Sequence, residues 1–248
     1  MEGIDIVGIK KKVILFLVEG ISEDEALSAL ISNIIKNDTV AFQIMYGDVT
    51  SDINSSQQNI RRVINEKIKE YMTESKVKKK DILSVVHLID IDGAYIKNEE
   101  FMIENNEILK GFKYYSNEIH AYSKEKIINR NSKKSSIMNL LSSTNEISSI
   151  KYKAYYFCCN LDHVLYDDAN LDEELKIRYA EDFQDEFYDN EIEFINFMSK
   201  SNFAVSGNYN DTWNFLKKDL NSLGRYSNFH LFFSDFRDCI KDEYKENF

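Results

Sequence analysis

Two apolar runs, each of which stops at a carboxylate and soon reaches a glycine, constrain the fold of this chain most strongly. Residues 13–18 run into Glu19-Gly20, and residues 85–89 run into Asp90-Ile91-Asp92-Gly93. An unbroken apolar run is typical of a strand buried on both faces of a parallel sheet. Because the carboxyl ends of parallel strands lie along one edge of a sheet, where ligands bind, we expect the three carboxylates to converge there.

Apolar periodicity around these runs predicts alternating strands and helices. Residues 26–35 have apolar side chains at helical spacing, and Ser22 with Glu25 forms a candidate capping box at the start of this helix. The order strand-helix-strand-helix-strand favours a parallel sheet with right-handed crossovers. The elements expected next are a strand over 40–46, an amphipathic helix over 60–71 and a strand over 82–89.

The remainder of the chain predicts one more strand and a helical end. Residues 151–159, rich in Tyr, Phe and Ala, predict a fourth strand that runs into Asp162. We therefore predict an α/β domain over residues 1–165, with a mostly parallel central sheet in Rossmann-like layers. A helical C-terminal portion, residues 166–248, is expected to pack on it. Residues 1–12 are expected to be an extension with a basic end.

The negative charge of the chain is concentrated in one segment. The net charge is −11, and residues 162–193 contain 13 acidic and 2 basic side chains, so the remainder is neutral. A net negative charge argues against indiscriminate binding of nucleic acid, but a neutral remainder leaves room for a basic face. The segment is interpreted as a solvated helical face. The alternatives are that it binds a basic partner protein or covers a basic groove until substrate displaces it.

The sequence predicts neither a membrane span nor a leader. No run approaches the ~20 apolar residues that cross a bilayer, and the acidic start of the chain lacks a signal-peptide pattern. The three cysteines have no spacing typical of a zinc site and no even count for disulfides. We therefore expect a cytoplasmic protein with no membrane partner.

Carboxylate oxygens are the ligands that hard divalent cations prefer, so Glu19, Asp90 and Asp92 predict a site for Mg²⁺ or Mn²⁺. In an extended Asp-x-Asp both side chains lie on one side, and a cation between them would relieve their repulsion. Asp162 is a candidate fourth ligand, with a solvated acid at a helix start as the alternative. The alternative for the whole set is that the carboxylates only end strands and that Asp92-Gly93 forms a turn.

Glu19-Gly20 and Asp90-Ile91-Asp92, each ending an apolar strand, resemble the motifs of the TOPRIM fold, which topoisomerases, bacterial primases and several nucleases share. The similarity covers residues 13–93 and is greatest to small stand-alone proteins of the OLD-type and RloB-like kind. It implies magnesium-dependent phosphodiester cleavage. Asp90 and Asp92 would hold the metal, and Glu19 would be a further ligand or activate water. It also implies a role in phage defence or on a mobile element.

A basic stretch after the Asp-x-Asp strand is the preferred candidate for holding phosphate groups. Its residues are Lys124, Lys126, Arg130, Lys133 and Lys134. Contacts of this kind supply affinity without sequence choice, and the alternative is an ordinary solvated surface. His87, inside the third strand, is interpreted as a core residue and not as a ligand.

These features predict a metal-dependent nuclease that cleaves DNA or RNA. The main alternative is a non-catalytic TOPRIM-like subunit that binds or regulates within a nucleic-acid-processing or defence complex. The chain has no G-x-x-x-x-G-K-[ST] motif and therefore no ATPase of its own. Nucleic acid is the expected partner, an ATPase or another protein is a further candidate, and a homo-oligomer is left open.

Overall fold

The computed structural model describes residues 12–36, 40–108 and 110–248, and strands and α-helices alternate from residue 12 to residue 90. The predicted N-terminal extension lies, apart from Lys12, outside the described residues. The strands are β1 (Lys12–Val18), β2 (Val40–Tyr46), β3 (Ile82–Asp90), β4 (Met102–Glu104), β5 (Lys113–Tyr114), β6 (Ile119–Ala121), β7 (Glu146–Ile147) and β8 (Ile150–Phe157). The helices are α1 (Ile21–Ile34), α2 (Ile60–Glu74), α3 (Lys124–Leu141), α4 (Leu161–Tyr166), α5 (Glu173–Phe187), α6 (Glu191–Lys200), α7 (Tyr209–Leu216) and α8 (Leu231–Asp235).

The central sheet has five strands in the order β2-β1-β3-β8-β7. The first four are parallel, and β7 is antiparallel because it joins β8 through a tight hairpin. Ser148 and Ser149, the two residues between β7 and β8, both have positive φ, as a two-residue hairpin turn requires. The predicted α/β class with a mostly parallel sheet is confirmed.

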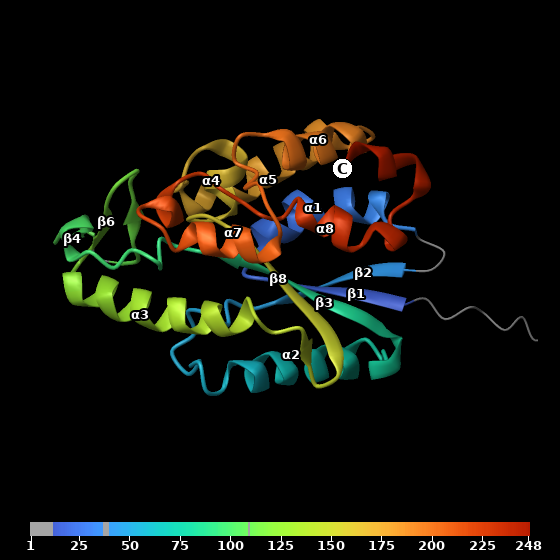
Figure 1. The fold of residues 1–248 in the computed structure, drawn as a ribbon, viewed down its shortest axis with the longest axis horizontal. Helices are drawn as coiled ribbons and strands as arrows, with labels where there is room; N and C mark the ends of the chain where they lie inside the picture. Colours follow the sequence, from blue (N-terminus) through green and yellow to red (C-terminus); the bar gives the residue numbers. More distant parts are fainter. Residues whose placement is uncertain (1–11, 37–39, 109) are drawn as a thin grey trace, which may run out of the picture.

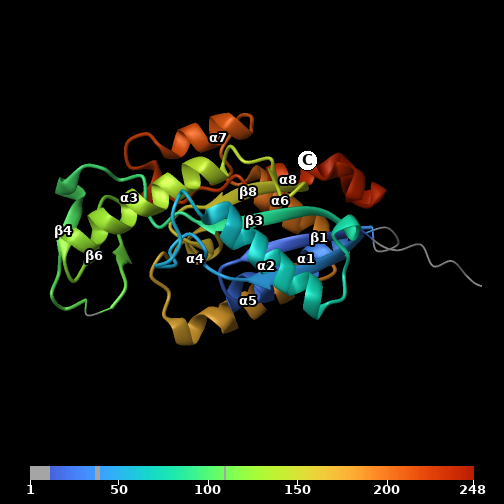
Figure 2. The same ribbon diagram turned by 90° about the horizontal axis from the view of Figure 1, so that it is seen from below.

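Helices cover both faces of this sheet, which explains why the strand sequences are mostly apolar. Phe16 of β1 packs in a core with α1, α5, α6 and α8, whereas its neighbour Leu17 packs in a second core with α2, α3 and α7. Figures 1 and 2 show α1, α5 and α6 on one face and α2 on the other. Alternate strand residues therefore pack into different layers, and Lys151 and Lys153 at the start of β8 are polar exceptions.

A small second sheet lies beside the carboxyl edge of the central one. Its strands have the order β4-β6-β5, and a third core that includes Ile119 and Leu223 packs against it. Figure 1 shows this sheet beside the start of α3, at the opposite end of the molecule from the amino-terminal ends of β1 and β2. The sequence offered no regular pattern here, because each of these strands has only two or three residues.

The acidic segment 162–193 is part of the helical layer on the first face. Ala180, Phe183 and Phe187 of α5 are buried in the first core, while the acidic side chains lie on the outer side. The prediction of a solvated acidic face is therefore confirmed for α5. The alternative of a detachable cover is wrong for α5, because displacing it would expose aromatic side chains of the core.

The start of α1 differs from the prediction. The helix begins at Ile21 with Gly20 as N-cap, and the Glu23 carboxylate accepts the Gly20 N–H at 2.8 Å. The predicted box of Ser22 and Glu25 is wrong by two residues, because the helix begins directly after Gly20. The side chain of Glu23 is consequently buried instead of lying on the surface.

The first four predicted strands are otherwise confirmed, and so is the helical C-terminal portion. Within the described residues, no helix combines the length and hydropathy that a membrane crossing would require.

Candidate functional site

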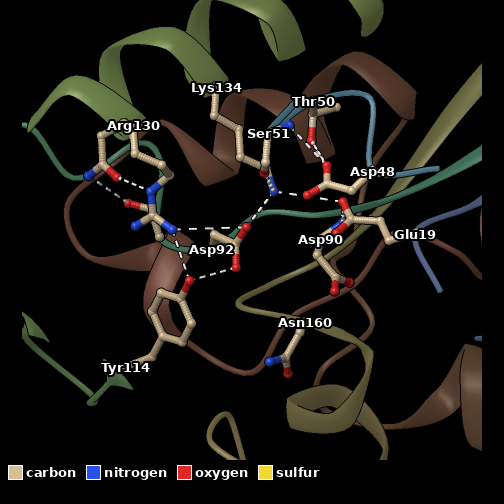
Figure 3. A network of polar contacts seen from close by, with 12 residues as sticks. Glu19, Asp48, Thr50, Ser51, Asp90, Asp92, Tyr114, Arg130, Lys134 and Asn160 are labelled. Carbon is tan, nitrogen blue, oxygen red and sulfur yellow. Dashed lines mark hydrogen bonds and ion pairs between the residues drawn. The ribbon is translucent and has the colours of Figure 1, made fainter. Parts of the chain in front are cut away.

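The carboxyl ends of the parallel strands form the floor of one cleft with a volume of about 680 Å³. Glu19 follows β1, Asp48 follows β2, Asp90 ends β3, and Asn160 follows β8. Figure 3 shows these side chains together with Asp92, which lies two residues beyond the end of β3. The predicted convergence of Glu19, Asp90 and Asp92 is therefore present in the fold.

Backbone N–H groups hold the carboxylates of Glu19 and Asp90 in place. The Asp90 N–H donates to Glu19 Oε1 at 3.2 Å, and the Leu161 N–H at the start of α4 donates to Asp90 Oδ1 at 3.1 Å. Burial raises the pKa of both carboxyl groups well above the usual range, and the neighbouring carboxylates raise it further. Without a cation the protonated forms are therefore favoured, and a bound cation would stabilise the ionised carboxylates.

Asp92 has a different environment. Its φ is +55°, so the chain turns at this residue, and the prediction of an extended Asp-x-Asp with both side chains on one side is wrong. The Tyr114 hydroxyl donates to Asp92 Oδ1 at 2.7 Å, and the Lys134 ammonium contacts Oδ2. Burial raises the pKa of Asp92, but the charges of Lys134 and Arg130 outweigh it and hold the pKa below its usual value.

Two cationic residues of α3 enter the site from its side. Lys134 is 1% exposed, and Arg130, one helical turn earlier, donates to the Tyr114 hydroxyl at 2.8 Å. The Arg130 guanidinium also lies 4.1 Å from the centre of the Phe112 ring, at the cleft wall. These two members of the predicted phosphate-binding group are thus part of the carboxylate site itself.

The other three members of that group lie elsewhere on α3. The Lys133 ammonium contacts the Asp52 carbonyl, the Lys126 ammonium lies 5.3 Å from the centre of the Tyr122 ring, and Lys124 is in the first turn. None of these three lines the cleft, as far as the described residues go. The structure therefore divides the predicted group into a buried pair and a surface set.

Asp162 lies beside the cleft instead of on its floor. Its carboxylate is 6% exposed and lies 3.7 Å from the Lys176 ammonium. Burial raises the pKa of Asp162 to about 6 even though Lys176 opposes it. Asn160, two residues earlier, takes the place at the strand end that the sequence suggested for Asp162, and its side chain caps α4 through the His163 N–H at 2.9 Å.

Asp48 is the site residue that sequence reasoning missed. It follows β2 after a single glycine, whereas Glu19 follows β1 directly, and the Asp48 carboxylate raises the pKa of Glu19. Its Oδ1 accepts the Ser51 N–H at 2.9 Å. The signal was available, because Gly47-Asp48 ends an apolar strand in the same way as the other two motifs. No sequence pattern marks Tyr114 as a site residue, because only the fold of the small sheet brings β5 close to Asp92.

Comparison of the chain with protein-family models, with curated proteins and with solved structures gives no match. The function of the cleft must therefore be inferred from its own residues.

The donor set of the floor suits one hard cation bound by few protein ligands. Among the described residues, no three His, Cys, Asp or Glu side chains are grouped as a ready-made metal cage. Mg²⁺ differs from other ions in that it keeps several waters and is usually held by one or two carboxylates together with substrate phosphates. Glu19 and Asp90, which are joined through the Asp90 N–H, fit that description.

The walls of the cleft carry basic side chains beside two further acids, Asp172 and Glu173. Its basic lining residues are Lys110, Lys113, Arg130 and Lys176. Lys113 is contributed by β5 and Lys176 by α5, so the two lie on walls built by different parts of the chain. The cleft therefore offers carboxylates to a cation and basic side chains to an anionic substrate, although Lys176 is already paired with Glu173 at 2.7 Å.

His87 is a buried core residue, as the sequence predicted, and it gives the protein a pH-dependent stability. It is 1% exposed, its Nδ1 lies 2.7 Å from the Tyr152 hydroxyl, and burial lowers its pKa to about 3. An unfolded histidine titrates near pH 6.5, so from there down to about pH 3 the unfolded chain binds the extra proton. His87 therefore contributes stability above pH 6.5, and this contribution falls with decreasing pH by at most ~1.4 kcal/mol per unit.

The measurement is urea unfolding of the wild type and of His87→Gln at several pH values between 7 and 4. Gln keeps a polar partner for Tyr152 but does not titrate, so the wild type should lose more stability than the variant on acidification. A difference between the two proteins that stays constant over this range would contradict the prediction.

Proposed function

We propose that this protein is a metal-dependent nuclease that cleaves phosphodiester bonds in DNA or RNA with Mg²⁺ or Mn²⁺. The observation that carries the proposal is a cleft that combines strand-end carboxylates on its floor with basic side chains on its walls. The resemblance of Glu19-Gly20 and Asp90-Ile91-Asp92 to TOPRIM motifs agrees with it. A role in phage defence or on a mobile element is proposed on that resemblance alone.

The carboxylates of Glu19 and Asp90 would hold the ion in this proposal. A divalent ion there neutralises charge on a phosphoryl oxygen and lowers the pKa of bound water. The Glu19 carboxylate has a raised pKa, so in its ionised form it is also suited to accept a proton from the attacking water. Asp48 and Asn160 would orient water around the pair.

The basic walls would position the substrate. Lys113 and Lys176 line the cleft on separate walls and would contact the phosphates on either side of the scissile one. Such contacts hold the backbone and read no bases, so we expect cleavage with little sequence preference. They also release counterions, so binding should weaken steeply as salt increases.

The experiment that tests this function is cleavage of single- and double-stranded DNA, structured RNA and transfer RNA. Each substrate is incubated with Mg²⁺, with Mn²⁺ or with chelator, beside Glu19→Ala protein made in the same way. Cutting that needs metal and is lost in the variant would support the proposal and identify the substrate. Folded protein that cuts none of them under any condition would contradict it.

The alternative is a regulatory subunit that binds a protein partner. The observation that favours it is the outer face of α5, where Leu175, Ile177 and Tyr179 are at least 38% exposed among acidic residues. Thermal unfolding with and without Mn²⁺ separates the two functions. An ion-binding site should raise the unfolding temperature, whereas a subunit without such a site should show no change.

A further inference from the structure

A buried ammonium group lies inside the carboxylate cluster. The side chain of Lys134 is 1% exposed, and its Nζ contacts the Asp92 carboxylate. It lies 3.3 Å from Ser51 Oγ and 3.7 Å from Glu19 Oε1. An ammonium has three N–H donors, of which Asp92 and Ser51 accept two, and Glu19 lies at ion-pair distance from the same group. Figure 3 shows Lys134 on the line between Asp92 and Glu19.

Both oxygens of Asp92 are already occupied by the protein. Tyr114 donates to Oδ1 at 2.7 Å, and Oδ2 contacts Lys134 with Arg130 Nη1 at 3.9 Å. A metal ion bound by Asp92 would displace these donors and would lie beside two cationic side chains. Breaking a buried ion pair is strongly destabilising, so Asp92 is poorly suited to be a metal ligand.

Asp90 has no such partner. Its Oδ1 accepts one backbone N–H, and within the described residues no ion pair reaches its carboxylate. Glu19 Oε1 lies 3.7 Å from the Lys134 ammonium, which is beyond hydrogen-bond distance. Both carboxylates line the cleft. The two members of the Asp-x-Asp motif therefore differ, because Asp92 anchors a lysine and Asp90 is left for a cation.

We propose that the chain binds a single divalent ion, through Glu19 and Asp90, and that Lys134 supplies beside Asp92 the positive charge that a second ion would bring. This inference rests on the metal site of the proposed function and deepens it. It reassigns Asp92 from metal ligand to the partner that positions Lys134. The second positive charge is then a permanent part of the fold, independent of metal concentration.

The test counts bound ions by titrating the protein with Mn²⁺ and following the electron paramagnetic resonance signal of the free ion. The wild type should bind one ion per chain. The double variant Lys134→Met/Asp92→Asn removes both charges of the pair together, and it should still bind one ion with an affinity within about threefold of wild type. Glu19→Gln should weaken binding by more than about tenfold, because a ligand charge is lost.

Lys134→Met alone frees the Asp92 carboxylate, so it should bind two ions per chain. Lys133→Met is the matched control, since its ammonium contacts the Asp52 carbonyl instead, and it should bind one ion like wild type. Circular dichroism verifies folding, and if Lys134→Met does not fold, the charge-neutral double variant decides.

Three results would overturn the inference. A wild type that binds two ions, one of them lost in the double variant, would show that Asp92 is a ligand while the metal site itself exists. A folded Lys134→Met protein that binds only one ion would show that Lys134 does not exclude a second. A wild type that binds no ion would contradict the metal site of the proposed function as well.

Discussion

Asp90→Asn protein is expected to lose at least about a hundredfold in metal-dependent cleavage while remaining folded. The amide oxygen can still accept the Leu161 N–H, so the local hydrogen bond at the start of α4 is kept. The ligand charge is lost, and metal ions stabilise charge in the transition state by several kcal/mol, with each 1.36 kcal/mol giving a factor of ten. The measurement is the initial rate of cleavage of the best substrate at saturating Mg²⁺.

Thermal unfolding of the same variant adds a second readout. Burial and the neighbouring carboxylates raise the pKa of Asp90, so its ionised form is unfavourable in the metal-free protein. The variant should therefore unfold at the same or a higher temperature without metal, and the increase caused by Mn²⁺ should disappear. Asp185→Asn, an exposed acid of α5 outside the cleft, is the control and should behave like wild type. Metal-dependent cleavage by Asp90→Asn at near the wild-type rate would contradict the assignment.

Gly93→Ala is expected to destabilise the protein by roughly 2–4 kcal/mol, from left-handed backbone strain and overpacking. Gly93 has a φ of +64°, and a Cβ there would lie 2.7 Å from Leu223 Cδ2 and 2.8 Å from Ile119 Cδ1. Both of these side chains are buried in the third core, so neither can withdraw without a cost. The measurement is the free energy of unfolding in urea.

Gly111→Ala is the matched control for this prediction. Gly111 has a similar φ of +73°, but a Cβ there would meet no atom within 4 Å. It should therefore show only the backbone strain, ~1 kcal/mol. Equal destabilisation of the two variants would mean that contact with Ile119 and Leu223 contributes nothing. Because Gly93 follows Asp92 in the same turn, the larger effect would also show how tightly the third core holds the turn that carries Asp92.

The strands and the convergence of Glu19 and Asp90 could be predicted because they depend on local pattern. An apolar run of six residues, such as 13–18, has few alternatives to a buried strand, and parallel order brings the ends of such strands to one edge. The helix start at Gly20 was missed because Ser22 and Glu25 offer an equally good local capping pattern. Only the short turn after β1 decides between them.

Asp92 and Lys134 show what a linear pattern cannot contain. The sequence presents Asp92 as a metal ligand beside Asp90, and Lys134 as one of five basic residues expected to hold phosphate groups. The direction of α3 across the strand ends brings Lys134 to Asp92, and the turn at φ +55° moves Asp92 away from Asp90. Their pairing joins residues 42 positions apart, so no local propensity encodes it.

The sequence by itself determined the α/β class, the parallel strands and the edge at which the carboxylates gather. These follow from hydrophobic period and strand order, which are properties of neighbouring residues. Only the tertiary structure decided which carboxylates are neutralised and which remain for a cation. That choice depends on burial and on distances of a few ångströms between side chains from different elements, and Coulomb energies in a buried site vary steeply over such distances.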